Sequence, residues 1–148
     1  MPVVALKKIS LSSEKEQLFA VEGVSSYEDF VHQAKLPTLL GVSGRVISAL
    51  AERIGSRSLA ADAISGDLHL SKRTLQRHLQ QQQVCFTDLR DKVRLNFVLP
   101  LLLENELSID RLSAMLDFTD RTSFTLAFKR WTGLSPNAFR KLFRDYNS

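Results

Sequence analysis

Apolar residues recur at every third or fourth position from about residue 45 onward, which is the spacing of amphipathic helices. The stretch 45–54 shows this clearly, because its apolar residues share one helical face and Gly55 supplies a stop signal. We interpret the preceding stretch, 41–44, as a joint. No part of the chain alternates apolar and polar residues as a half-buried strand would. The pattern therefore predicts an all-α fold.

Capping signals divide the rest of the chain into further helices, expected over about 59–67, 71–82, 87–103, 108–116, 120–131 and 136–144. The predicted N-caps are short polar side chains: Ser71, Ser108, Ser135, and either Asp120 or Thr119. Pro136 follows its cap directly, where proline suits the first helical turn. Pro100 lies inside the longest helix and is expected to kink or weaken it.

The first 44 residues carry weaker signals. Ser13 with Glu16 forms a possible capping box for a short helix that ends near Glu22. Ser26 is expected to cap a second short helix over 27–35, which Leu36-Pro37 would stop. The sequence thus predicts a short helical segment in front of the main domain.

One pattern occurs twice, at 64–74 and at 112–122. Each copy predicts a short helix, a tight turn, a serine or threonine and the start of a second helix. The apolar positions correspond in register, with one residue inserted in the second copy before its last two: Ile64 with Leu112, Leu68 with Leu116, Leu70 with Phe118, Leu75 with Phe124, and Leu79 with Phe128. This is the arrangement of a helix-turn-helix DNA-binding unit.

In the first copy, the second helix carries a polar stripe opposite its leucines: Arg73, Gln76, Arg77 and Gln80. Arginine can donate two hydrogen bonds to guanine and glutamine can pair with adenine in the major groove. A solvated helix face would show the same stripe. The position directly after a helix-turn-helix corner favours the base-contacting interpretation.

In the second copy, the apolar side consists of Phe124, Phe128 and Trp131, which we expect to pack in the core. The outward stripe is poorer in hydrogen-bond donors: Thr122, Thr125, Leu126 and Lys129, with Arg121 just before it. An outward leucine could contact a thymine methyl group or a partner protein, or be a single tolerated apolar residue.

Charge and cysteine content narrow the class of protein. A formal charge of +4 and a pI of about 9.5 suit binding to a polyanion. The single cysteine, Cys85, excludes an intramolecular disulfide, and no cluster of Cys and His has zinc spacing. No apolar run approaches the roughly 18 to 20 residues of a membrane span, and no signal peptide is evident. We expect a cytoplasmic protein without metal, cofactor or membrane contact.

An enzymatic function is disfavoured. The possible nucleophiles or bases are few and have no carboxylate partner at a defined spacing: Cys85, His32, His69 and His78. The sequence therefore predicts no catalytic residues.

The segment Leu-Ser-Lys-Arg-Thr-Leu-Gln-Arg at 70–77, together with 118–136 and Phe139-Arg140, resembles the DNA-binding domain of the AraC/XylS transcription regulators. The resemblance extends from about Leu59 to Arg144. It implies two helix-turn-helix units, about 58–82 and about 108–131, joined by the 87–103 helix within a domain spanning 45–148. Residues 1–44 would then be a linker, or a remnant or fragment of a regulatory domain.

The resemblance also assigns DNA contacts. Base contacts fall on Arg73, Gln76, Arg77, Arg121, Thr122, Thr125 and Leu126. Phosphate contacts are expected from Lys72, Thr74, Gln80, Ser123, Lys129 and Arg130. Arg94 and Arg140 match recurrent arginines of the family, and we expect structural pairing or capping from both.

Several residues depart from the family pattern. Ser65 and Ser113 replace alanine, and both are small enough to pack. Asp117 and Gln83 replace glycine; aspartate tolerates unusual turn angles, whereas Gln83 predicts a differently shaped helix end. Leu126 replaces a frequent arginine. We therefore expect the first unit to dominate sequence recognition and the second mainly to dock.

The expected partners are double-stranded promoter DNA and RNA polymerase. An effector or a dimerisation partner is not identified by the sequence. About 45 residues precede the domain, which is too few for a complete β-barrel sensor, so the chain is either a fragment of a longer regulator or a compact one. The alternative function is a protein-interaction module that keeps the fold with weak or lost DNA binding.

Overall fold

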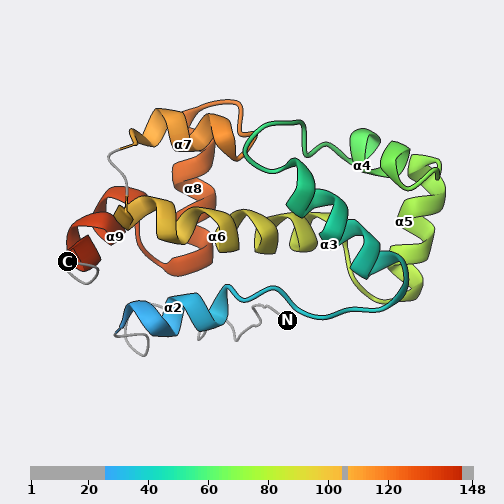
Figure 1. Cartoon of the computed structure of the whole chain (residues 1–148), viewed down its shortest axis with the longest axis horizontal. Coiled ribbons are helices and arrows are strands. Elements are labelled where there is room, and N and C mark those ends of the chain that lie inside the picture. The colour runs from blue at the N-terminus through green and yellow to red at the C-terminus, as the bar shows by residue number, and fades with distance from the viewer. Residues whose placement is uncertain (1–25, 105–106, 145–148) are drawn as a thin grey trace.

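The computed structural model describes residues 26–104 and 107–144, and the regular elements in those ranges are all helices (Figure 1). They are α2 (Tyr27–Gln33), α3 (Gly41–Arg53), α4 (Ala61–Asp67), α5 (Lys72–Gln81), α6 (Phe86–Glu104), α7 (Ile109–Met115), α8 (Arg121–Thr132) and α9 (Pro136–Phe143). The predicted all-α fold is confirmed. The short helix expected between Ser13 and Glu22 lies outside the described residues.

Helix α6 runs along the long axis of the molecule and contributes to two separate cores (Figure 1). Its first half supplies Leu89 and Val93 to a core built with α3, α4 and α5. Its second half supplies residues from Leu95 to Leu102 to a core built with α7, α8 and α9. Two helix-turn-helix units joined by a long helix are therefore present as predicted. The helix continues through Pro100 to Glu104.

Helix α2 packs on the second core, although it precedes the first core in the sequence. The ring of Phe30 meets those of Phe139 and Phe143 edge-on, with centroids 5.1 and 5.7 Å apart. The Lys92 ammonium of α6 donates a hydrogen bond to the Gln33 carbonyl at 2.9 Å. The chain then crosses to the other end of the molecule, where α3 begins at Gly41.

The predicted serine N-caps are confirmed. The hydroxyls of Ser71, Ser108 and Ser135 each accept the backbone N–H of the residue three positions later, at 3.0 Å. Of the two candidates for α8, Asp120 is the cap, and its carboxylate accepts the Ser123 N–H at 2.8 Å. Local side-chain chemistry thus fixes the start of each of these helices.

The joint predicted at 41–44 is wrong, because these residues form the first turn of α3. The cap comes from Gln82, whose side-chain oxygen accepts the Ser43 N–H at 2.9 Å while its amide nitrogen donates to the Leu40 carbonyl at 2.9 Å. Gly44 is required by close packing, since an added Cβ would lie 2.2 Å from the Leu39 carbonyl oxygen. The glycines here allow a crowded helix start.

Helices α4, α5 and α7 end on left-handed residues that are not glycine: His69, Gln83 and Asp117, with φ between 59 and 63°. In each case the next N–H bonds to a carbonyl five residues back, as in Val84 to Leu79 at 3.1 Å. These are glycine-type helix ends. The different shape expected at Gln83 is therefore wrong.

Ser65 and Ser113 pack as expected in place of alanine. Both are buried, with 4% and 2% of their surface exposed. Their hydroxyls donate to the carbonyls of Asp62 at 3.0 Å and Asp120 at 2.8 Å. Each serine therefore satisfies its polar group within its own helix-turn-helix unit.

Arg94, from the middle of α6, holds the end of α7. Its guanidinium donates to the carbonyls of Leu116 at 2.8 Å and Asp117 at 2.9 Å, and lies 3.9 Å from the centroid of the Phe118 ring. Arg140 similarly donates to the Leu102 and Leu107 carbonyls at 2.8 Å. The expected capping role of both arginines is confirmed.

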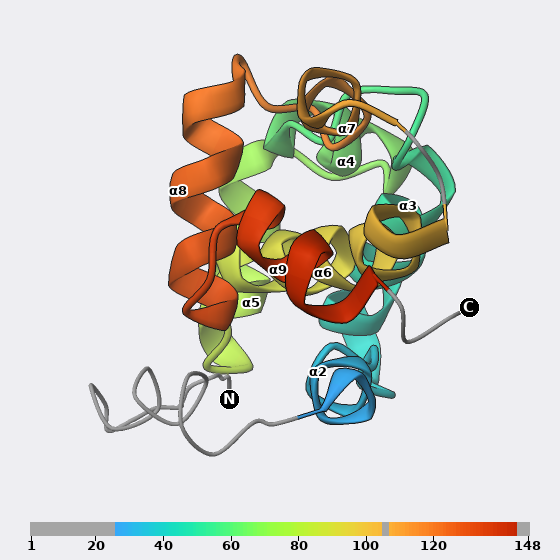
Figure 2. The same cartoon turned by 90° about the vertical axis from the view of Figure 1, so that its left-hand side faces the viewer.

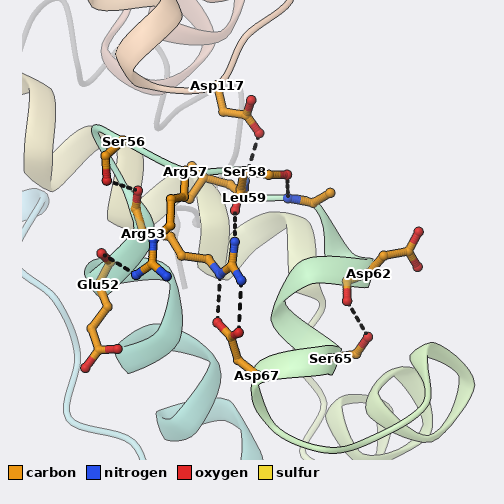
Figure 3. A network of polar contacts seen from close by, with 11 residues as sticks. Glu52, Arg53, Ser56, Arg57, Ser58, Leu59, Asp62, Ser65, Asp67 and Asp117 are labelled. Carbon is orange, nitrogen blue, oxygen red and sulfur yellow. Dashed lines mark hydrogen bonds and ion pairs between the residues drawn. The ribbon is translucent and has the colours of Figure 1, made fainter.

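The α3–α4 connection joins the two units (Figure 3). Arg53 binds both oxygens of the Asp67 carboxylate, at 2.7 and 2.9 Å, and so fixes the end of α3 to the end of α4. From this connection, the Gly55 N–H donates to the Met115 carbonyl at 3.0 Å. The Leu59 N–H donates to the Asp117 carboxylate at 2.8 Å.

Replacing Gln83 with glycine should stabilise the protein. The substitution keeps the observed backbone and removes the cost of a left-handed non-glycine residue, so we expect a gain of about 0.5–1 kcal/mol in the free energy of unfolding. Gln80→Gly, inside the same helix, should instead lose about 1 kcal/mol. Urea denaturation of both variants measures the difference; a loss of stability in Gln83→Gly would contradict the assigned helix end.

The Arg53–Asp67 pair should make stability depend on pH. The hydrogen bond from Arg53 lowers the pKa of the Asp67 carboxyl below its ordinary value. A carboxyl whose pKa is lower in the folded state stabilises above its unfolded pKa, and this contribution is lost as pH falls through the folded pKa.

We therefore expect Asp67→Asn to be less stable than wild type at pH 7, with the difference shrinking below about pH 4, near the unfolded pKa of aspartate. Urea denaturation across pH 2.5–7 measures it. Glu52→Gln, which removes an exposed α3 carboxylate with no ion pair in the described ranges, is the control. A difference for Asp67→Asn that stays constant with pH would contradict the role of its charge.

Candidate nucleic-acid interface

The second helices of the two units, α5 and α8, lie on the same side of the molecule. Figure 1 shows α5 beyond the N-terminal end of α6 and α8 crossing beside α6, with α5 and α8 running in nearly the same direction. Figure 2, viewed along the length of the molecule, shows both at the left, while α3 lies at the right. The helices that carry the predicted contact residues of both units therefore lie on one side of the molecule.

Helix α5 buries its leucines and exposes its polar stripe. Leu75 and Leu79 are 0% and 1% exposed. The four stripe side chains are exposed and form no hydrogen bond or ion pair within 26–104 and 107–144: Arg73, Gln76, Arg77 and Gln80. Two guanidinium groups and two amides are thus free to bind groups outside the chain.

Helix α8 buries its aromatic side as expected. Phe124 and Phe128 are fully buried, and the half-buried Trp131 packs on the same core. On the outward side, Thr122 is exposed, Thr125 is half-buried and Leu126 is 62% exposed. The middle of this surface therefore offers hydroxyl and methyl groups, and its charged donors, Arg121 and Lys129, lie towards the two ends of the helix.

Several predicted contact residues have carboxylate neighbours within the chain. The charged atoms lie 3.5 Å apart in each pair: Lys72 with Asp62, Arg121 with Asp110, and Arg130 with Asp91; the first two pairs are exposed, whereas Asp91 is half-buried. Exposed pairs contribute little to stability, so Lys72 and Arg121 can exchange a carboxylate for another anion. Asp62 and Asp110 occupy equivalent positions in the repeat, which is a signal that the sequence interpretation missed.

The N-termini of α5 and α8 differ in charge. Helix α5 is capped by the neutral Ser71, whose hydroxyl also donates to the Thr74 hydroxyl at 2.9 Å. Helix α8 is capped by Asp120, and hydrogen bonding from Ser123 lowers the pKa of this exposed carboxyl, which keeps it charged. A helix N-terminus attracts anions, and a carboxylate placed there repels them. The α5 end therefore suits a phosphate better.

The other candidate groups do not assemble into a site. Cys85 is an exposed residue just before α6. Partial burial of its thiol is the chief cause that raises the pKa of that group. His69 is the left-handed residue of the α4–α5 turn. No group of three metal-binding side chains was found in the described part of the chain. Within that part, no helix combines the length and apolar character needed to cross a membrane.

Comparison with known proteins gives a consistent picture. A family model described as a helix-turn-helix domain matches residues 64–142. The HTH-type transcriptional regulator VqsM of Pseudomonas aeruginosa is 36% identical over 76 residues, which make up 51% of this chain and 23% of that protein. The chain thus spans between 22% and 33% of the length of the curated relatives it matches.

Solved structures are similar over a larger part of the chain. The transcriptional regulator CdpR of Pseudomonas aeruginosa superposes with a TM-score of 0.63 and 25% identity, covering 89% of this chain and 40% of that one. A transcriptional regulator from Chromobacterium violaceum, described as having an AraC-type DNA-binding domain, superposes with a TM-score of 0.55 and 18% identity. That match covers 72% of this chain and 95% of the other, and shows a shared fold.

Proposed function

The chain belongs to the AraC-type helix-turn-helix family, and from that premise we propose that it is a sequence-specific DNA-binding regulator of transcription. It would place α5 and α8 in successive major grooves of double-stranded promoter DNA. The observation that carries this proposal is that α5 and α8 lie on one side of the molecule (Figures 1 and 2) and that most of their predicted contact residues are exposed.

The placement of α5 and α8 supports binding to one side of the duplex. Successive major grooves on one side of B-DNA are about 34 Å apart. Two recognition helices on one side of a single chain would reach neighbouring grooves without a second copy of the chain, and the site they recognise would be asymmetric.

We assign the main base recognition to α5. Arg73 and Arg77 can each bind a guanine edge and Gln76 an adenine edge. In α8, base contacts would come from Arg121, Thr122, Thr125 and Leu126, with Leu126 placed to contact a thymine methyl group. Phosphate contacts would come from Lys72, Thr74, Gln80, Ser123, Lys129 and Arg130, which add affinity and salt dependence but no sequence information.

The unequal surfaces support unequal roles. Helix α5 presents free guanidinium and amide groups at its central contact positions, whereas α8 presents threonine and leucine there and has the Asp120 carboxylate at its N-terminus. We infer that α5 determines most of the sequence preference and that α8 mainly docks. RNA polymerase is the proposed protein partner at promoters in the cytoplasm. The matched relatives are longer proteins, and we assign no effector to the residues described for this chain.

A second candidate function is a protein-interaction module of the same fold. The observation in its favour is Leu126, which is 62% exposed in the middle of α8. Such a module would bind DNA weakly and without sequence preference. The selection experiment described next distinguishes it from the DNA-binding regulator.

Selection of bound sequences from a random duplex library should enrich an asymmetric motif with two blocks about one helical turn apart. Arg77→Ala should weaken one block, with a loss of about 1–3 kcal/mol in discrimination at the affected base pair. Leu126→Ala and Thr125→Ala should change the other block less. Parallel selections with the four proteins give the comparison.

Two outcomes would contradict the proposal. A larger loss of specificity in Leu126→Ala or Thr125→Ala than in Arg77→Ala would reverse the assigned roles of α5 and α8. An absence of enrichment by the wild-type chain would favour the interaction module.

Asp120→Asn should strengthen DNA binding. Asparagine caps a helix about as well as aspartate, so the start of α8 is preserved while a negative charge near the phosphates is removed. We expect affinity for a selected site to rise by about threefold at low salt and the gain to fall as salt screens it.

Fluorescence anisotropy at two salt concentrations measures the effect of Asp120→Asn. The control is Glu52→Gln, which removes one negative charge from α3, on the other side of the molecule (Figure 2). Equal gains in both variants would indicate an effect of net charge alone and would place the α8 N-terminus away from the phosphates.

A further inference from the structure

We propose that Asp117 is a positioning residue that sets the separation of α5 and α8, and with it the spacing of the two DNA blocks that the chain accepts. This inference rests on the proposed DNA-binding function. It concerns a carboxylate that belongs to no predicted contact set.

The side chain of Asp117 connects the two helix-turn-helix units. Asp117 lies in the turn between α7 and α8, and one of its carboxylate oxygens accepts the Leu59 N–H at 2.8 Å (Figure 3). Leu59 precedes α4, and its side chain is completely buried in the first core. A hydrogen bond to a charged acceptor therefore ties the turn of the second unit to the core of the first.

The backbone around Asp117 is held from two further directions. Arg94 of α6 donates to the Asp117 carbonyl at 2.9 Å. The Gly55 N–H donates to the carbonyl of Met115, the last residue of α7, at 3.0 Å. Helix α8 begins at Arg121, four positions after Asp117. A displacement of this turn would therefore move α8 relative to α5.

The residue type at position 117 is informative. Its φ of 63° is left-handed, a conformation that glycine adopts freely and that aspartate and asparagine tolerate best among the other residues. Glycine would satisfy the backbone but would leave the Leu59 N–H without this acceptor. The turn itself therefore does not need the Asp117 side chain. The role that we assign to this side chain is the hydrogen bond between the two units.

The first repeat supports this distinction. His69 occupies the position equivalent to Asp117, with a φ of 59°. The His69 side chain forms no hydrogen bond with the described residues. The same turn therefore forms in the first unit without a side-chain acceptor, so the bond from Asp117 serves the contact between units.

A rigid separation of α5 and α8 would affect which spacings between the two DNA blocks the chain can bind. Adding one base pair between two blocks moves them about 3.4 Å further apart and rotates one by about 35° around the duplex axis. Two flexibly joined units can adjust to such a change, whereas two rigidly joined units lose contacts in one block. The Asp117–Leu59 bond should therefore appear as selectivity for one spacing.

The matched variants are Asp117→Gly and Asp117→Asn, in the full chain. Both accept the left-handed backbone, but the asparagine oxygen can still accept the Leu59 N–H while glycine offers no acceptor. Spin labels on Gln81→Cys in α5 and Asn137→Cys in α9, in a Cys85→Ser background, report the distance between the units without DNA. We expect a broader distance distribution in Asp117→Gly than in wild type, and a wild-type distribution in Asp117→Asn.

The second measurement uses duplexes that carry the two selected blocks at the preferred spacing and at one base pair more or less. We expect wild type and Asp117→Asn to lose affinity by about tenfold at the wrong spacings, and Asp117→Gly to lose clearly less, as the removal of one hydrogen bond to a charged group allows. In Asp117→Gly, affinity for the preferred spacing should change less than the ratio of affinities between the right and wrong spacings. If Asp117 only supported the fold, affinity for all spacings would fall together.

The two measurements separate the inference from the function beneath it. Equal distance distributions and equal spacing profiles in wild type and Asp117→Gly would overturn the positioning role while leaving DNA binding intact. If the wild-type chain selects no two-block sequence, the proposed function fails, and the distance measurement alone then decides whether Asp117 fixes the units. Urea denaturation of both variants confirms that the proteins compared are folded.

Discussion

The burial of one guanidinium, that of Arg94, is the constraint on which the arrangement of this molecule depends. Arg94 is 6% exposed and lies on α6 between Val93, which belongs to the first core, and Leu95, which belongs to the second. It satisfies the carbonyls at the end of α7 and covers the Phe118 ring. Burial lowers its pKa to about 10, so it stays charged at neutral pH. Without it, buried carbonyls would lose their partners and the turn before α8 would lose its support.

The helices of this chain could be predicted from the sequence where their signals are local. The serine caps of α5, α7 and α9 and the repeated apolar register define both helix-turn-helix units, because each signal acts within a few residues. The start of α3 could not be predicted in this way. Its cap is the side chain of Gln82, which lies 39 positions beyond Ser43 in the sequence. Residues 41–44 contain no capping carboxylate or amide, so a contact made by the fold replaces the missing local signal.

The outward faces of the candidate site follow from helical periodicity, which explains why the exposure of Arg73, Arg77 and Leu126 agrees with the sequence interpretation. How the outward faces of α5 and α8 lie relative to each other does not follow from helical periodicity. The Asp117–Leu59 bond joins residues 58 positions apart, and the Arg130–Asp91 pair joins residues 39 positions apart. Periodicity places a residue on a face of its own helix, but only packing against α6 decides which residues of other helices it meets.

The structure suggests how α8 can contribute to DNA recognition even if it makes few base-specific contacts. If α5 supplies most of the base contacts, its binding holds α8 near the neighbouring groove, and the second contact becomes intramolecular. The affinity that this second contact adds then depends on how narrowly α8 is held, because a helix whose central contact residues are threonine and leucine binds a groove well in few orientations. The hydrogen bonds made by Arg94, Gly55 and Asp117 hold α8 in one orientation relative to α5. Helix α8 would thus add specificity through its fixed position, with threonine and leucine sufficient to accept or reject the groove presented to them.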